Sequence, residues 1–378
     1  MGDTTVARAR TGAQHEWAER LGGGRVVAIL PAHDEEQCLP AALASLQHQT
    51  RPPDEVLVVA DNCSDRTAEI AYRLGAQVLV TRDNEHKKAG ALNQALDVLL
   101  TRLDDADLVL VMDADSHLER EFLAEARRHL VESWQPDSTT CLGGVGGTFS
   151  GGRGGGLVGT FQRNEYARYA RDVRRLKGRA LVLTGTASVF PARVLREVRD
   201  ARRAGRLPDQ SGAGQVYDVH VLTEDNELSL GLLHLGYGIL APSGCVLETE
   251  VMTTWGDLAR QRARWKRGAL ENIADYGLNR VTRPYWGRQV LSALGLVATA
   301  LYLGSVVWGL TTTMTWHPFW LAVSAVFAIE RIVTVRRRGL GQMLLAAPLV
   351  IEMVYDIFLQ AVQAYAFTQA IFKLERRW

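Results

Sequence analysis

Residues 108–115 read Leu108-Val109-Leu110-Val111-Met112-Asp113-Ala114-Asp115, a short apolar run that ends in two carboxylates. Five consecutive apolar residues bounded by polar ones are typical of a buried strand. Two carboxylates at positions i and i+2 after such a strand can jointly hold a hard divalent cation, and that cation suits the oxygens of a diphosphate. The run therefore predicts a central strand with a candidate metal site at its end.

Three more apolar runs precede this one and alternate with segments of helical character. The predicted strands are Val26–Leu30, Val56–Ala60 and Gln77–Val80, and the predicted helices are Leu39–Gln47, one opened by Ser64 or Asp65, and Ala89–Leu100. Strands spaced by helices indicate an α/β fold with a mostly parallel sheet, whose ligands bind outside the carboxyl ends of the strands. Polar clusters stand at these ends, namely His33-Asp34-Glu35, Asp61 and Asp113-Ala114-Asp115.

Charge is distributed unevenly along the 378 residues. The whole chain has 43 Lys and Arg against 42 Asp and Glu, a balance that excludes binding of nucleic acid by bulk positive charge. By contrast, residues 289–378 carry only 11 charged side chains, and none occurs from Gln289 to Ile329. A membrane-spanning helix needs roughly 20 apolar residues, so this stretch predicts a helical hairpin in a membrane.

These features predict a large soluble domain followed by a membrane region. The expected parts are a loose tail over residues 1–24, a soluble domain over residues 25–288 and a transmembrane helical region over residues 289–378. The expected spans are Val290–Leu310 and Phe319–Val335, and the arginines at 336–338 mark the cytoplasmic side. The N-terminal residues lack the apolar core of a signal peptide. We therefore expect a multi-pass protein of the cell membrane with its soluble domain in the cytoplasm, and the topology after Leu340 is left open.

Further polar motifs extend the candidate site. Lys88 opens the segment Lys88–Asn93, Thr223-Glu224-Asp225 precedes a predicted helix, and Gln261-Arg262-Ala263-Arg264-Trp265 lies shortly before the apolar region. These motifs supply carboxylates that can contact a nucleotide base or hold a metal, a cation that can pair with phosphate, and an Arg/Trp pair. Together they predict a transferase with a nucleotide-activated donor. The alternative for Asp225 is a capping role at the start of its helix, and the alternative for Trp265 is a core or interfacial anchor.

Together these motifs resemble those of the family 2 glycosyltransferases of the GT-A fold, and within them the membrane-bound branch of cellulose, hyaluronan and poly-N-acetylglucosamine synthases. The matching segments are Leu30–Glu35, Val58–Asp65, Lys88–Asn93, Asp113–Asp115, Thr223–Asp225 and Gln261–Trp265. They occur in the family's order over about residues 26–270. The chain departs from the family at His33-Asp34, where an aromatic residue and Asn are more common, and in its smaller membrane region.

The resemblance implies a donor site at the carboxyl ends of the strands. Glu35 and Asp61 would line the uracil and the ribose, with Asp61 accepting from the N–H of the base. Lys88 would neutralise the diphosphate. Asp113 would touch the nucleotide, and Asp115 would hold Mg²⁺ or Mn²⁺ together with Asp113.

The resemblance also implies a catalytic and acceptor side. Asp225 would be the general base, beside Glu224, and Gly185 belongs to a segment that usually lies near the acceptor. Three residues of the last motif would close over the diphosphate and the acceptor sugar, namely Gln261, Arg264 and Trp265.

The implied activity is inverting transfer of a sugar from a UDP-sugar to a saccharide acceptor, in polysaccharide or oligosaccharide synthesis. Two alternatives remain: a single transfer onto a lipid acceptor, and a non-catalytic sensor of nucleotide sugars. The Gln-x-x-Arg-Trp pattern favours synthesis, the small membrane region favours the single transfer, and the full set of acids argues against the sensor. Expected partners are the donor, a saccharide or lipid-linked acceptor and membrane lipids. The sugar, its linkage and the formation of a homo-oligomer are left open.

Overall fold

The computed structural model describes residues 15–311 and 349–374, and a few residues between them at 322, 325–326, 329 and 332–333. The chain packs into two compact units. The first contains the residues up to Gly152 together with Asp172–Glu250, and the second contains Arg153–Arg171 and the residues from Val251 onward. Residues 251–288, which the sequence assigns to the soluble domain, therefore pack in the second unit.

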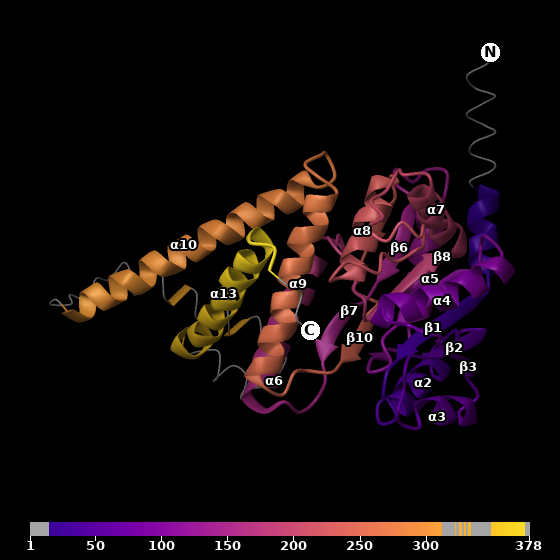
Figure 1. Ribbon diagram of the computed structural model, residues 1–378, viewed down its shortest axis with the longest axis horizontal. Helices are drawn as coiled ribbons and strands as arrows, with labels where there is room; N and C mark the ends of the chain where they lie inside the picture. Colours follow the sequence, from indigo (N-terminus) through magenta and orange to yellow (C-terminus); the bar gives the residue numbers. More distant parts are fainter. Residues whose placement is uncertain are drawn as a thin grey trace, which may run out of the picture. The chain divides into compact units, whose positions relative to one another are not determined.

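The first unit is built on a seven-stranded sheet with the order β3-β2-β1-β4-β8-β6-β9 (Figure 1). Its strands are β1 (Val26–Ala32), β2 (Glu55–Ala60), β3 (Gln77–Val80), β4 (Leu108–Met112), β6 (Leu142–Gly146), β8 (Ala187–Pro191) and β9 (Gly238–Leu240). The first four run parallel to one another, whereas β8 runs antiparallel to β4 and β6. The predicted α/β fold with a mostly parallel sheet is confirmed.

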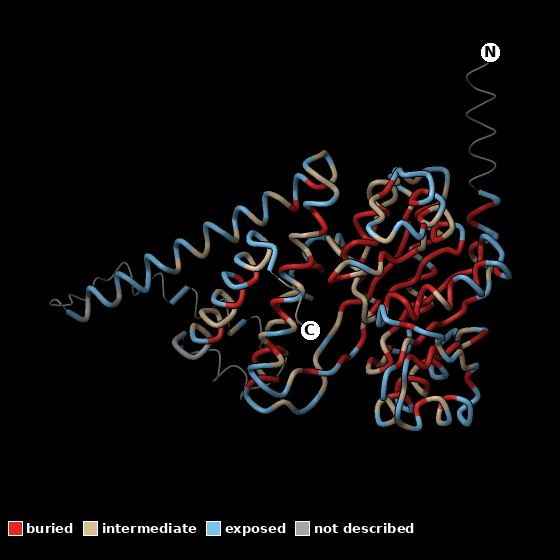
Figure 2. Tube along the Cα trace, viewed as in Figure 1, coloured by how far each residue is buried: buried red, intermediate tan, exposed pale blue. Residues whose placement is uncertain are grey.

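Helices of the first unit pack on this sheet and close its core. They are α2 (Leu39–Gln47), α3 (Thr67–Arg73), α4 (Lys87–Arg102), α5 (Phe122–Ser133), α7 (Ala192–Arg203) and α8 (Glu224–His234). All five residues of β4 are buried, as expected for a central strand covered on both faces, and Figure 2 shows the interior of this unit largely buried.

The order of the strands reverses beside β1. The chain leaves β1 for β2 and β3 on one side and returns to β4 on the other side, where Ile29 pairs with Val111. Ligands of open α/β sheets bind outside the carboxyl ends of the strands at such a reversal. The loops after β1 and β4, which carry Glu35 and Asp113, therefore flank the expected ligand site.

A smaller three-stranded sheet has the order β5-β10-β7, with β5 (His117–Leu118), β10 (Val246–Thr249) and β7 (Thr148–Gly151). The segment 143–156 is rich in glycine, a composition typical of a flexible loop, but it contributes most of β6 and β7. The glycines permit close packing there: a Cβ at Gly147 would lie 2.3 Å from Leu247 Cδ2. Glycine at this position thus reflects strand packing rather than a loop.

The expectation of a loose tail over residues 1–24 is wrong for residues 15–23, which form a helix. Leu21 of this helix is fully buried, and the ring of Trp17 lies 5.7 Å from that of Trp134. Arg127 donates to the carbonyl of Gly22 at 2.8 Å and holds the end of the helix. Apolar contacts with distant parts of the chain, which local composition does not reveal, order this segment.

The second unit is helical. Its elements are most of α6 (Gly156–Arg175), α9 (Trp255–Asp275), α10 (Arg283–Thr311) and α13 (Leu349–Ile371). Val158 and Phe161 of α6 pack with Leu258 of α9 and Tyr355 of α13 in a buried cluster. Glu165 joins the same elements, since it accepts from Arg262 at 3.0 Å and from the Tyr355 hydroxyl at 2.6 Å.

The predicted membrane spans are not found. In the stretches of chain that the structure describes, no helix has both the length and the apolar character needed to cross a membrane. The first expected span, Val290–Leu310, lies in α10, whose first two turns carry the polar residues Arg283, Arg288 and Gln289. The second, Phe319–Val335, lies mostly outside the described residues.

Candidate active site

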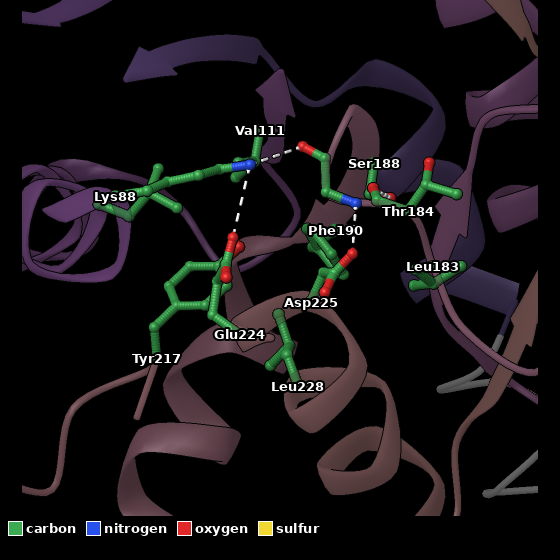
Figure 3. Close-up of a pocket in the computed structure, with 12 residues that line it drawn as sticks. Lys88, Val111, Leu183, Thr184, Ser188, Phe190, Tyr217, Glu224, Asp225 and Leu228 are labelled. Carbon is green, nitrogen blue, oxygen red and sulfur yellow. Dashed lines mark hydrogen bonds and ion pairs between the residues drawn. The ribbon is translucent and has the colours of Figure 1, made fainter. Parts of the chain in front are cut away.

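A small pocket lies against β4 and β8 in the first unit (Figure 3). Polar side chains and the Gly185 backbone converge in it from three separate parts of the chain: Lys88 at the start of α4, Gly185 just before β8, and Glu224 and Asp225 in the first turn of α8. The fold thus brings together four residues that the sequence analysis named.

Lys88 is the centre of this group. Its ammonium pairs with the carboxylate of Asp113 and donates to the carbonyl of Gly185 at 3.0 Å, and it lies 3.5 Å from Glu224 Oε1. Burial alone would lower the pKa of Lys88, but the carboxylates of Asp113 and Glu224 outweigh it and raise the pKa above its usual value. Lys88 is therefore a fixed positive charge among acids, and its contact with a diphosphate stays a prediction.

Two backbone N–H groups hold the carboxylate of Asp225 in place. Its Oδ2 accepts from the backbone N–H of Gly185 at 2.9 Å, and its Oδ1 accepts from that of Asn226 at 2.7 Å. Burial and the neighbouring Glu224 carboxylate raise the pKa of Asp225 to about 6, against the opposite effect of Lys88. The N-cap of α8 is Thr223, so Asp225 is not the capping residue that the alternative interpretation required.

Gly185 permits this arrangement because it has no side chain. A Cβ at this position would lie 3.1 Å from Lys88 Nζ and 3.2 Å from Asp225 Oδ2. Its N–H and its carbonyl serve opposite charges, since the N–H donates to Asp225 and the carbonyl accepts from Lys88. An alanine here would require its neighbours to move by a few tenths of an ångström.

The carboxylates after β4 fit a divalent cation. Burial raises the pKa of both Asp113 and Asp115, and Lys88 opposes this effect at Asp113. Burial, followed by the charges of Asp115, Glu250 and Asp113, raises the pKa of Glu35 to about 7. Acidic oxygens that repel one another in this way are the ligands that Mg²⁺ and Mn²⁺ prefer. Asp113 and Asp115 are the residues that would hold the ion.

A second group of ligand-type atoms, from Asp34, Cys63 and Asp65, lies within 4.8 Å but is explained by local structure. The carboxylate of Asp34 accepts from the backbone N–H groups of Ser64 at 2.7 Å and Asp65 at 3.2 Å. The carboxylate of Asp65 accepts from the backbone N–H of Thr67 at 2.8 Å. These hydrogen bonds tie the loop after β1 to the start of α3, and we assign no metal to them.

Asp61 lies after β2, is 6% exposed and is held at both its backbone and its side chain. Its carbonyl contacts His33 Nδ1 at 2.6 Å, and its Oδ1 accepts from Thr81 Oγ1 at 2.8 Å and from Asn84 Nδ2 at 2.7 Å. The sequence analysis missed Thr81 and Asn84. The polar loop after Gln77–Val80 was the available signal, because it ends a strand on the same edge of the sheet.

Tyr217 is a further residue that the sequence analysis missed. It is buried and lines the pocket, and its backbone is fixed by Asn93, which accepts from the Tyr217 N–H at 3.0 Å and donates to its carbonyl at 2.8 Å. Asn93 closes the Lys88–Asn93 motif, so this motif holds one wall of the pocket in addition to supplying Lys88. No pattern around Tyr217 marked it in advance.

Gln261, Arg264 and Trp265 lie on α9, in the second unit, and the structure describes them within that unit only. Arg262, between them in sequence, is 3% exposed, and its guanidinium lies 4.4 Å from the centre of the Trp265 ring. Cation–π contact and the ion pair with Glu165 therefore orient Trp265 on this helix.

The sequence is similar to those of known proteins. A family model described as Glycosyltransferase like family 2 matches residues 24–268. The poly-beta-1,6-N-acetyl-D-glucosamine synthase of Staphylococcus aureus (strain COL) is 24% identical over 291 residues, which cover 74% of this chain and 64% of that protein. The synthase of the same name from Staphylococcus epidermidis is 24% identical over 249 residues, covering 64% of this chain and 54% of the relative. The chain thus spans less than two thirds of the length of these curated relatives.

The fold is also similar to a solved structure, a mannosyltransferase from Pyrobaculum calidifontis in complex with GDP-Man and Mn²⁺. The two chains share a TM-score of 0.57 and 16% identity, over 98% of this chain and 97% of the other. A similarity at this level of identity establishes a common fold. The donor of this chain has to be inferred from the residues of its own site.

Proposed function

The chain belongs to the family 2 glycosyltransferases, with the GT-A fold, and from that premise we propose that it transfers a sugar from a UDP-sugar to a saccharide acceptor with inversion at the anomeric carbon. The observation that carries the proposal is the position and the raised pKa of the Asp225 carboxyl group. This group lines the pocket, accepts a hydrogen bond from the Gly185 N–H and has a pKa of about 6. Such a group is ionised at neutral pH and basic enough to take a proton from a hydroxyl.

In the proposed reaction, an acceptor hydroxyl attacks the anomeric carbon while its proton passes to Asp225. The bond from that carbon to the diphosphate oxygen breaks, and the nucleoside diphosphate leaves. A single base with no covalent intermediate gives inversion. Lys88 lies beside Asp225 and the other carboxylates, where its positive charge stabilises the negative charge that develops during the reaction.

A divalent cation bound to Asp113 and Asp115 would neutralise the departing diphosphate. Around it, Glu35 and Asp61 would contact the nucleoside, and Glu224 would keep Lys88 oriented towards the base. On the acceptor side, the family resemblance supports roles for Gln261, Arg264 and Trp265 in holding donor and acceptor together.

Synthesis of a polysaccharide or oligosaccharide is the product class that the relatives support, since two of them are named as synthases of a poly-N-acetylglucosamine. A single transfer onto a lipid acceptor would use the same residues and differ only in the product. The size of the product separates these two reactions.

The proposal includes attachment to the cell membrane, with several passes and with the catalytic unit in the cytoplasm. Its support is the uncharged run from Gln289 to Ile329 and the apolar side chains that α10 exposes. Leu291 is 67% exposed and Leu301 is 70% exposed, and Leu294 and Val297 between them are exposed as well, so α10 presents an extended apolar surface. Membrane flotation of the full chain tests this part, and recovery of the chain in the soluble fraction at high salt would refute it.

The activity is tested with the purified full chain in lipid, incubated with Mn²⁺ or Mg²⁺ and a panel of UDP-sugars, with GDP-mannose as the donor of another base. We expect release of UDP from one UDP-sugar and a saccharide product, and loss of both in the Asp225→Asn variant. Release of nucleotide from none of the donors, by protein that still binds UDP, would contradict the proposal and favour a sensor.

A further inference from the structure

Asn84 makes contacts that the reaction scheme does not use. The side chain lies in the loop between β3 and α4 and is 9% exposed. Its Nδ2 donates to Asp61 Oδ1 at 2.7 Å and to the carbonyl of Lys87 at 2.8 Å, while its Oδ1 accepts from the N–H of His86 at 3.0 Å. Two donor contacts and one acceptor contact fix the orientation of the amide. Asn84 is thus a rigid link between the start of α4 and Asp61.

The carboxylate of Asp61 is consequently bound on one side only. Its Oδ1 accepts from Asn84 at 2.7 Å, from Thr81 at 2.8 Å and from Asn62 at 3.2 Å. Among the residues that the structure describes, all three side-chain hydrogen bonds to this carboxylate go to Oδ1 and none goes to the second oxygen, Oδ2. A carboxylate with one oxygen saturated and the other unoccupied presents a single acceptor in a fixed direction.

Asn84 itself is held with little tolerance. A Cβ added at Gly90, one turn into α4, would lie 2.0 Å from Asn84 Oδ1, so only glycine fits beside the amide. The loop also places Asp83 and Lys87, on either side of Asn84, at φ angles of +45° and +49°. Non-glycine residues adopt such angles at a cost, which the surrounding hydrogen bonds must offset. The loop around Asn84 therefore has backbone strain at two positions.

We propose that Asn84 is a positioning residue that sets the base preference of the donor site, because it holds Asp61 so that only Oδ2 is presented to the nucleotide base. This inference rests on the proposed function, in which Asp61 faces the base. A lone acceptor pairs with a ring N–H, as in uracil at N3, and meets a repulsive lone pair in cytosine at the same position. A buried polar group that is left unpaired rejects the wrong ligand strongly. Uracil and cytosine are alike in size, so they separate this effect from shape.

The test is calorimetric binding of UDP and CDP, with Mn²⁺, to the full chain in lipid. The wild type should bind UDP at least tenfold more tightly than CDP. Asn84→Asp keeps the shape and the acceptor for His86 but replaces the donor by a second carboxylate beside Asp61. At pH 8 we expect UDP affinity to fall at least tenfold and the preference over CDP to fall towards one.

A second variant avoids the strained loop. Thr81→Val removes one donor from Asp61 Oδ1 and should weaken the preference in the same direction by about threefold, whereas Thr101→Val, on the exposed face of α4, should leave it unchanged. Thermal unfolding of each variant reports whether it folds. Equal losses of UDP and CDP affinity in Asn84→Asp would overturn the inference, and so would a wild type that binds both nucleotides equally. A wild type that binds neither would overturn the proposed function as well.

Discussion

The Asp225→Asn substitution tests the central chemical claim. The amide has nearly the shape of the carboxylate but cannot take a proton, and loss of a general base typically lowers the rate by about 10² to 10⁴. The side chain accepts from two backbone N–H groups, those of Gly185 and Asn226, and an amide offers only one oxygen. One hydrogen bond is therefore lost, at about 1 kcal/mol of folding stability, far less than the effect on the rate.

The pKa of Asp225 also predicts how far the rate should fall at acidic pH. With a pKa of about 6, Asp225 is ionised in about thirtyfold excess at pH 7.5 and protonated in about tenfold excess at pH 5. The wild-type rate should therefore fall about tenfold between these values as the base gains its proton. The residual rate of the Asn variant should lack this step, because the group that titrates is gone.

The assay is release of UDP at saturating donor and acceptor from pH 5 to 8.5, with UDP affinity measured in parallel. We expect affinity for UDP to change less than twofold in the Asn variant. A variant rate within threefold of the wild type, or the same acid limb in both proteins, would refute the assignment of Asp225 as the base.

Three further predictions concern the surroundings of this base. Asp115→Ala should abolish turnover and weaken Mn²⁺ binding, measured by electron paramagnetic resonance, with an unchanged melting temperature; full wild-type activity in EDTA would argue against a metal. Gly185→Ala should lower the rate at least tenfold in steady-state kinetics, because its Cβ would lie 3.1 Å from Lys88 Nζ. A rate near that of the wild type would show that the pocket has room for the methyl group. Glu227→Gln removes the negative charge that faces the Arg202 guanidinium, at a place where both side chains are at most 3% exposed. Denaturant unfolding should therefore show a loss of about 3–5 kcal/mol, and a loss below about 1 kcal/mol would show that the ion pair is dispensable.

Local patterns were sufficient for the first four strands and for the acids near their ends. Leu108–Met112 and Val26–Leu30 were identified because an apolar run of strand length needs only its own residues and its neighbours to be recognised. The place of Asp113 and Glu35 at one edge then followed from a general rule of parallel sheets. The family resemblance, which rests on the order of short motifs, was equally independent of three-dimensional detail.

Other features depended on partners far away in the sequence. Residues 15–23 read as a tail because the contact of Trp17 with Trp134 has no local signature. The glycine-rich composition of residues 143–156 gives no local sign of the strands that they form. Their close packing on Leu247 and other side chains is visible only in the folded chain.

The sequence alone was enough to identify the fold class, the family and the acids at the strand ends, since these follow from periodicity and from motifs of a few residues. Only the tertiary structure shows that Lys88 contacts both Asp113 and the carbonyl of Gly185, which lies 97 residues after Lys88. It also shows that Asn84 donates to one oxygen of Asp61. The reason is physical. A hydrogen bond depends on distances of a few tenths of an ångström, and these are set by strand register, by loop conformation and by the rotamers of many packed side chains together.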